Sequence, residues 1–200
     1  MLARLIRGLL LVSVLIGVWQ IGQVALFHAK ALVAENLIER AWQATLKGET
    51  RVRPWPWADT WPVAEMSVPS LGIRQIILSG DSGRVLAFGP GHTEQSAQPG
   101  AAGLAMVSAH RDTYFQFLQE LKAGDDIFLH TVDTKRRYEV KEFAVVDQRH
   151  YQVDANNFYD PLPIRSASLI LVTCYPFDAI RAGGDQRFLV LAVTSNEEII

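Results

Sequence analysis

A stretch of 20 residues without a charge, Gly8–Phe27, constrains this chain more than any other feature of its sequence. Fourteen of these residues are hydrophobic, and about 20 apolar residues in one helix span the hydrocarbon core of a bilayer. Arg4 and Arg7 precede the stretch, and such positive flanks stay in the cytoplasm. We therefore predict a cytoplasmic tip and transmembrane anchor over residues 1–28. The rest of the chain then lies on the extracytoplasmic (periplasmic) side of the inner membrane.

Two other interpretations of the stretch are less favoured. A cleaved signal peptide has a shorter apolar region, about 7–15 residues, that ends in a small-x-small site; Ala29-Lys30-Ala31 is a weak match to such a site. The core helix of a soluble protein usually carries a polar face, which this stretch lacks. The uncleaved anchor fits the length best.

Residues 29–65 read as a stalk followed by a linker. The first part is expected to be a helix that ends at Gly48. Its apolar residues recur at helical spacing: Leu32, Val33, Leu37, Ile38, Ala41 and Trp42. The segment RVRPWPWADTWPVAEM then brings three prolines and three tryptophans, and proline favours extended chain. We expect these tryptophans to pack on the following domain, with a membrane-surface aromatic belt as the competing interpretation.

The remainder, residues 66–200, is predicted to be a mainly β domain. Short β-rich segments alternate with Gly, Pro, Asp and Asn clusters, which is typical of a small barrel or sandwich of about eight strands. The expected strands are Met66–Val68, Gln75–Ser79, Val85–Phe88, Leu104–Ser108, Asp126–Thr131, Arg137–Val146, Ser168–Thr173 and Phe188–Thr194. One helix is expected over Thr113–Ala123, ending at Gly124. The alternation shifts phase between Val140 and Phe143, which suggests a β-bulge.

Composition excludes several classes of function. The single cysteine rules out an intramolecular disulfide and any all-cysteine metal site. A pI near 6.2 and a formal net charge of −2 argue against a nucleic-acid partner. We expect no cofactor.

Cys174 is the first candidate for chemistry. It ends the apolar, strand-like segment Leu169–Thr173, just before the chain turns at Tyr175-Pro176, so it is expected at a rim that substrate can reach. A nucleophilic thiol needs a nearby base or cation. Without such partners, Cys174 would be an inert buried cysteine.

His110 and Arg187 are the best-placed partners. His110 ends a strand-like segment, and Arg187 directly precedes the last predicted strand. If the strands at Cys174 and Arg187 pair in antiparallel fashion, the two side chains reach the same rim. The other histidines and a loop arginine are weaker candidates: His28, His92, His130, His150 and Arg181.

These motifs together resemble the sortase family. The resemblance covers roughly residues 66–194 and includes the anchor-plus-barrel layout; it rests on Ser108–Asp112, Leu118–Asp125, Leu171–Cys174 and Arg187. The Pro-Trp-Pro-Trp segment, Phe88–His92 and Thr173–Phe177 further resemble the Gram-negative class GN subgroup of marine proteobacteria. Ala109 replaces the usual glycine before the histidine, and Ile170 replaces the leading threonine of the T-L-x-T-C segment.

The resemblance implies a closed sortase-type β-barrel and a cysteine transpeptidase. Cys174 would attack a C-terminal sorting signal of a secreted protein, His110 would act as acid and base, and Arg187 would stabilise the oxyanion. An amine of unknown identity would then resolve the thioester. Substrate contacts are expected from the loop Asp147–Ser166. The same loop has three carboxylates that could bind calcium, although loop carboxylates usually only face solvent: Asp147, Asp154 and Asp160.

Two other functions fit the same sequence. A hydrolytic cysteine peptidase would use the same triad, because water and an amine meet the same thioester. A non-catalytic, membrane-anchored β-barrel adaptor would need no reactive thiol at all.

Overall fold

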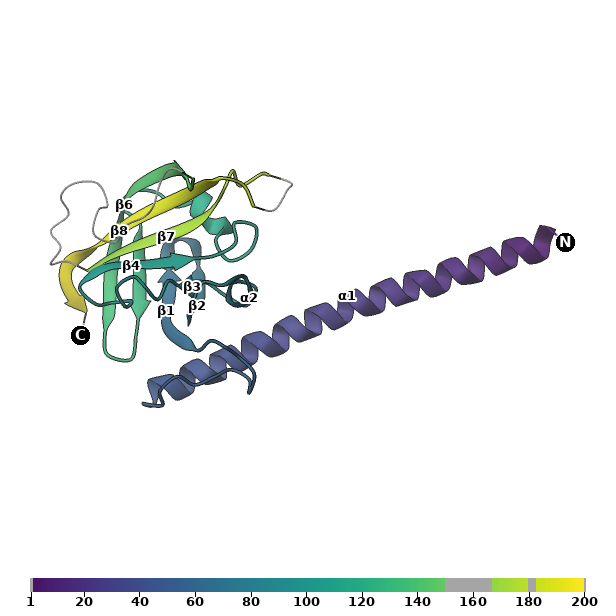
Figure 1. The fold of residues 1–200 in the computed structure, drawn as a ribbon, viewed down its shortest axis with the longest axis horizontal. Helices are drawn as coiled ribbons and strands as arrows, with labels where there is room; N and C mark the ends of the chain where they lie inside the picture. The colour runs from purple at the N-terminus through teal and green to yellow at the C-terminus, as the bar shows by residue number, and fades with distance from the viewer. Residues whose placement is uncertain (1, 150–166, 180–182, 200) are drawn as a thin grey trace. The chain divides into compact units, whose positions relative to one another are not determined.

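The computed structural model of the chain describes residues 2–149, 167–179 and 183–199 (Figure 1). It consists of two compact units, Met1–Leu37 and Ile38–Ile200. A single long helix, α1 (Leu2–Leu46), supplies all the described residues of the first unit and the beginning of the second.

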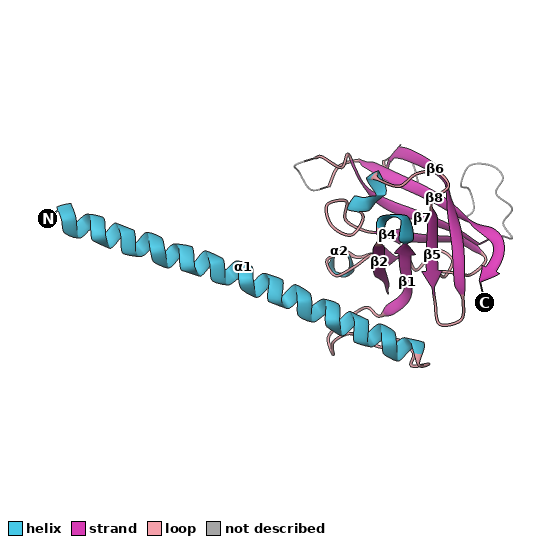
Figure 2. Ribbon diagram, turned by 180° about the vertical axis from the view of Figure 1, so that it is seen from behind, coloured by secondary structure: helices cyan, strands magenta, loops and turns pink. Residues whose placement is uncertain are grey.

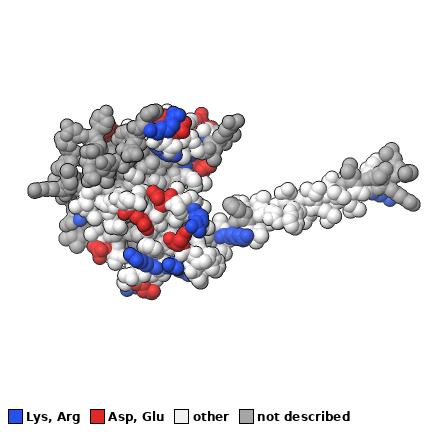
Figure 3. Space-filling view, in the orientation of Figure 1, with Lys and Arg blue, Asp and Glu red and all other residues white. Residues whose placement is uncertain are grey.

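The first unit presents its apolar side chains to the outside. Leu15 is 68% exposed and Ile21 is 72% exposed, and Figure 3 shows white, uncharged surface along most of the helix between blue residues toward its two ends. Among the described residues, α1 is the one helix long and apolar enough to cross a membrane, a test that a signal sequence near the N-terminus also passes. Such exposure of large apolar side chains is costly in water, so it favours a lipid or protein environment for this segment.

The second unit is a closed β-barrel of eight strands, as predicted (Figure 2). The order around the barrel is β1-β2-β3-β4-β7-β8-β6-β5, and β5 closes on β1. The pairs β2–β3 and β4–β7 are parallel, and the others are antiparallel. The elements are β1 (Pro62–Val68), η1 (Pro69–Leu71), β2 (Ile73–Ser79), α2 (Gly83–Leu86), β3 (Gly91–His92), β4 (Gly103–Ser108), η2 (Gln116–Gln119), β5 (Asp126–His130), β6 (Lys135–Asp147), β7 (Ala167–Tyr175) and β8 (Gln186–Ile199).

The alternation of side chains along the strands separates an inner core from an outer apolar cluster. Every second residue of β4, β7 and β8 faces the barrel interior, where they pack with residues of the other strands: Ala105, Val107, Leu169, Leu171, Val190 and Ala192. The residues between them form the outer cluster, on the opposite face of the same three strands: Leu104, Ile170, Leu189 and Leu191, with Met106, Ala144, Val146 and Val172 against them. These strands are therefore apolar on both faces.

The end of α1 belongs to the barrel unit. Trp42 is fully buried there, and its indole Nε1 donates to Glu65 Oε2 at 3.2 Å. Arg74 bridges the same carboxylate to Glu39 of the helix at 2.7 and 3.0 Å. These contacts attach residues from Ile38 onward to strands β1 and β2.

The tryptophans of the linker differ in whether they pack on the domain or face outward. The Trp55 ring packs edge to face on Phe88 with centroids 4.8 Å apart, and Arg51 lies 5.2 Å over the Trp61 ring. Trp57 is 82% exposed. Packing on the domain thus accounts for Trp55.

Two predicted elements differ from the structure. Val85–Phe88, predicted as a strand, contains the end of helix α2 and a turn, because the Ser82 side chain caps the helix by accepting from Val85 N. The helix predicted over Thr113–Ala123 is reduced to the 3-10 turn η2. The predicted phase shift is confirmed, since the β6–β8 register slips between Val140 and Glu142.

The buried phenol of Tyr138 gives a test of the core. Burial raises its pKa to about 12, so the unfolded chain loses this proton near pH 10 while the folded chain keeps it. Stability should therefore fall as the pH rises from about 10 to 12. We expect Tyr138→Phe to remove this alkaline loss and to change the unfolding free energy at pH 7 by less than about 1 kcal/mol. Urea unfolding at pH 7 and pH 11 measures both, and an equal alkaline loss in the variant would contradict the assignment.

Candidate active site

Cys174 and Arg187 lie on the neighbouring strands β7 and β8, and His110 lies two residues beyond the end of β4. Ala109, just past the end of β4, packs in the interior cluster, whereas the following residue, His110, is exposed. Thr173 is buried and Cys174 is half-buried one position further along β7. The thiol therefore shares the face of the outer apolar cluster rather than that of the core.

The parallel pairing of β4 and β7 brings the segment of His110 to the end of β7. Ser108 pairs with Val172 in the register. Beyond that pair, Ala109 N donates to Val172 O at 3.2 Å, and Thr173 Oγ1 donates to Ala109 O at 2.7 Å. These bonds place Ala109, the residue before His110, beside Thr173, the residue before Cys174.

The antiparallel pairing of β7 and β8 sets Arg187 directly opposite Cys174. Directly paired residues project from the same face of a sheet, with Cα atoms about 5 Å apart. The Arg187 guanidinium is oriented by the protein: Nη1 donates to Gly184 O at 2.7 Å and to Gln186 O at 2.9 Å, and Nη2 donates to Gln148 Oε1. The structure thus pairs two of the three predicted site residues, Cys174 and Arg187, and places the residue before His110 against the end of the same strand, β7.

This rim has the chemical groups that acyl transfer requires. The thiol is half-buried and the imidazole is exposed, so both lie where a peptide can approach. A thiol beside an imidazole supplies a nucleophile and a proton carrier, and a guanidinium supplies donors for developing negative charge.

The other candidate residues lie elsewhere. His92 is buried on β3, with its Nε2 2.8 Å from Ala97 O and 3.1 Å from Ser96 Oγ. His130 packs edge to face on Trp42. His28 is in the first unit, and His150 and Arg181 lie outside the described residues.

Two residues near this site, Arg111 and Gln148, were not among the candidates predicted from the sequence. Arg111 is buried and donates to carbonyls of the loop between β7 and β8. Gln148 holds Arg187 from the end of β6. The position of Arg111 directly after His110 was the only available signal, and a charged residue there usually lies in solvent.

Much of the loop expected to contact substrate, Asp147–Ser166, lies outside the described residues, including Asp154 and Asp160. Asp147 forms an ion pair with Arg149 at 2.7 Å. Within the part of the chain that the structure describes, no group of three or more His, Cys, Asp or Glu side chains is arranged to hold a metal ion.

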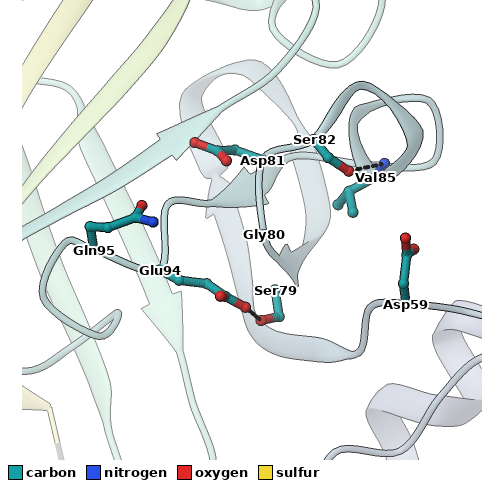
Figure 4. Close-up of a pocket in the computed structure, with 8 residues that line it drawn as sticks. All are labelled: Asp59, Ser79, Gly80, Asp81, Ser82, Val85, Glu94 and Gln95. Carbon is teal, nitrogen blue, oxygen red and sulfur yellow. Dashed lines mark hydrogen bonds between the residues drawn. The ribbon is translucent and has the colours of Figure 1, made fainter.

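A pocket of about 170 Å³ lies elsewhere on the barrel, where β2 ends and β3 is followed by a loop (Figure 4). Its three acidic side chains already have partners. Glu94 accepts from Ser79 Oγ at 2.9 Å, Asp81 accepts from Thr93 Oγ1 at 2.7 Å, and Asp59 pairs with Arg84. The strands β3 and β4 separate β2 from the strand of Cys174, so this pocket is not part of the rim.

The hydrogen bond from Thr173 to Ala109 can be tested against a matched bond. Thr60 is equally buried and also donates to a backbone oxygen, Ser79 O, at 2.7 Å. We expect Thr173→Val and Thr60→Val each to lower the unfolding free energy by about 1–2 kcal/mol, because each leaves a buried carbonyl unpaired. Only Thr173→Val should also change the rate at which iodoacetamide alkylates Cys174. Equal alkylation rates in both variants would show that this bond does not position the rim.

Comparison with known proteins identifies the family. Residues 66–195 match the family model described as the sortase domain. This match covers more than half of the chain and every strand that carries the rim residues. The chain belongs to the sortase family.

Individual relatives show how far the similarity extends. The chain is 28% identical to sortase D of Bacillus subtilis (strain 168) over 125 aligned residues. These residues make up 62% of this chain and 60% of that protein. Its fold is similar to sortase C-1 of Actinomyces oris, with a TM-score of 0.56, 25% identity, and coverage of 68% of this chain and 76% of the other. The pilus-related sortase C of Group B Streptococcus gives a TM-score of 0.54 at 27% identity, covering 67% of each chain.

Proposed function

We propose that this protein is a membrane-anchored cysteine transpeptidase of the Gram-negative class GN kind, which cleaves a C-terminal sorting signal on a secreted protein and transfers it to an amine. The observation that carries the proposal is the pairing of Cys174 on β7 with Arg187 on β8, together with the hydrogen bond that joins Thr173 to Ala109, the residue before His110. Family membership supports the chemistry, and the aromatic and proline motifs of the sequence support the subgroup.

The first half of the reaction forms a thioester. The Cys174 thiolate attacks the carbonyl carbon of the scissile peptide bond, and Arg187 donates hydrogen bonds to the resulting oxyanion. His110 gives its proton to the departing amine nitrogen as the C–N bond breaks. The products are an acyl-enzyme on Cys174 and the released C-terminal fragment.

The second half reverses these roles. The incoming amine attacks the thioester carbonyl, and His110 takes the proton that the amine loses. Collapse of the tetrahedral intermediate releases the Cys174 thiolate and leaves a new amide bond. The net change is the exchange of one amine for another, so no oxidant or cofactor is needed.

The outer apolar cluster supports a peptide substrate at this rim. Val172 precedes Cys174 by two residues on the same face, and Val146 pairs with Arg187. Both are half-buried, so apolar side chains of a sorting signal would find apolar contacts beside the thiol. The loop Asp147–Ser166, between β6 and β7 in the sequence, is proposed to contribute contacts to the substrate.

The exposed apolar helix supports an inner-membrane location. Leu15 and Ile21 would contact lipid chains, while Arg7 and the N-terminus would stay in the cytoplasm under the positive-inside rule. The barrel would then meet its substrates on the periplasmic side, after their export.

A product assay separates transfer from hydrolysis. The full chain in lipid nanodiscs is incubated with synthetic peptides that carry an L-P-x-T-G type signal, with and without triglycine as the amine. We expect triglycine to divert most of the product from the free acid to the amide, in proportion to its concentration. Cleavage that yields only the acid at every triglycine concentration would instead assign a hydrolytic peptidase.

A further inference from the structure

Arg111 is a buried cation that the proposed mechanism does not use. The residue is only 6% exposed although it follows the exposed His110. Its guanidinium donates from Nη1 to Gly183 O at 3.3 Å and from Nη2 to Ala179 O at 3.0 Å. Burying a guanidinium is costly unless it is well hydrogen-bonded, so these contacts are specific structural features and not incidental surface contacts.

The two acceptors lie in the loop that joins the strand of Cys174 to the strand of Arg187. Ala179 lies four residues after the end of β7, and Gly183 lies three residues before the start of β8. One side chain therefore holds two points of the segment that separates the nucleophile from the cation. Arg111 directly follows His110, so these hydrogen bonds join the segment of His110 to that loop.

Two adjacent glycines, Gly183 and Gly184, connect Arg111 to Arg187 through their carbonyl groups. Gly183 and Gly184 have φ of 81° and 119°, values that other residues adopt only with strain. Gly183 O accepts from Arg111, while the next carbonyl, Gly184 O, accepts from Arg187 Nη1 at 2.7 Å. Consecutive carbonyls of one loop thus bind the two arginines.

We propose that Arg111 is a positioning residue that holds Arg187 beside Cys174 through the Gly183–Gly184 loop. By fixing Gly183, Arg111 sets the place of the Gly184 carbonyl, which in turn orients the Arg187 guanidinium. This inference rests on the proposed acyl transfer, since Arg187 matters there as the oxyanion donor.

Single variants measure the expected loss. Arg111→Met keeps most of the side-chain volume but has no donor, and Arg111→Lys can reach one carbonyl but not both. We expect kcat for peptide cleavage to fall about tenfold in Arg111→Lys and further in Arg111→Met, with KM changed less than twofold. Arg74→Met is the control: it removes another arginine with two oxygen partners, Glu39 and Glu65, on strand β2. Its kcat should stay within twofold of the unmodified protein.

A double-mutant cycle separates positioning from a general structural role. If Arg111 acts through Arg187, then Arg111→Lys should cost no more than twofold in a chain that already carries Arg187→Ala. A full tenfold loss on that background would overturn the proposal, and so would an unchanged kcat in both Arg111 variants. Circular dichroism and thermal melts confirm which variants are folded, and Arg111→Lys serves if Arg111→Met does not fold.

Thiol alkylation tests the same idea without any substrate. Arg187 pairs with Cys174, so Arg187→Ala should change the rate at which iodoacetamide alkylates Cys174 at a fixed pH. Arg111→Lys should change this rate in the same direction, and Arg74→Met should not. If the unmodified chain cleaves no peptide, the proposed function fails, while an alkylation rate unaffected by Arg111→Lys refutes the positioning role on its own.

Discussion

Cys174→Ala should abolish acyl-enzyme formation and lower peptide cleavage by at least about 10³-fold. The reason is that a covalent route requires its nucleophile, and the groups left at the rim can only stabilise the slower attack by water. Intact-mass spectrometry after incubation with the peptide should show an acyl adduct on the unmodified chain and none on the variant. Reversed-phase chromatography of the peptide measures the loss of cleavage.

The sequence allows any thiol adduct in this experiment to be assigned to one residue. Cys174 is the only cysteine in the chain, so every thiol adduct reports this one residue. The side chain is half-buried at a strand end, so alanine removes one sulfur atom without opening a large core cavity, and the variant should melt within a few degrees of the unmodified protein.

Two outcomes would reject the thioester mechanism. One is cleavage by Cys174→Ala at the normal rate. The other is an adduct on the unmodified chain that maps to no peptide acyl group. Full biological activity of the variant would instead favour the non-catalytic adaptor.

The barrel was predictable because its strands bury one regular face. Tyr138 and Val140 alternate with polar residues, and this alternation shifts by one residue before Phe143. The shift predicts a β-bulge there, and the β6–β8 register confirms the bulge. The segment around Val85 was not predictable in the same way. Its β-rich residues suggest a strand, but a cap at Ser82 turns the chain into α2.

The short strand β3 shows a second limit of the sequence. A Cβ atom at Gly91 would clash with Gly80 O, so the backbone approaches the preceding loop closely there. Nothing in the local pattern Gly89–His92 encodes that approach, because the contact depends on how the crossover from β2 returns. The burial of His92 in the barrel wall is therefore not predicted by the local sequence.

The candidate site was predictable where it depends on strand ends. Cys174 and Arg187 flank a loop between two apolar strands, so antiparallel pairing alone brings them together. The place of His110 depends on a parallel pairing between strands far apart in sequence, which the resemblance to sortases suggested and spacing did not. The contacts of Arg111 depend on two left-handed glycines and had no sequence signal of their own.

Arg187→Ala should lower kcat by about 10²–10³-fold while KM changes little. Removing one preformed donor to a developing oxyanion costs about this much in acyl-transfer enzymes. Arg187 pairs with Cys174 in the β7–β8 register, and its guanidinium is already oriented by Gly184 O and Gln186 O, so little reorganisation is needed when charge develops. Arg187→Lys keeps the charge but loses the planar set of donors, and should recover only part of the rate.

Gln148→Ala provides the matched control for orientation. It removes the side-chain oxygen that accepts from Arg187 Nη2, but leaves both backbone acceptors of Nη1 in place. We expect a loss of about 3–10-fold in kcat, smaller than that of Arg187→Ala, because the guanidinium keeps its charge and most of its restraint. Single-turnover acylation followed by quenched-flow mass spectrometry isolates the step at which the oxyanion forms. If Arg187→Ala raises KM and leaves the acylation rate unchanged, the arginine binds the peptide in the ground state and stabilises no oxyanion.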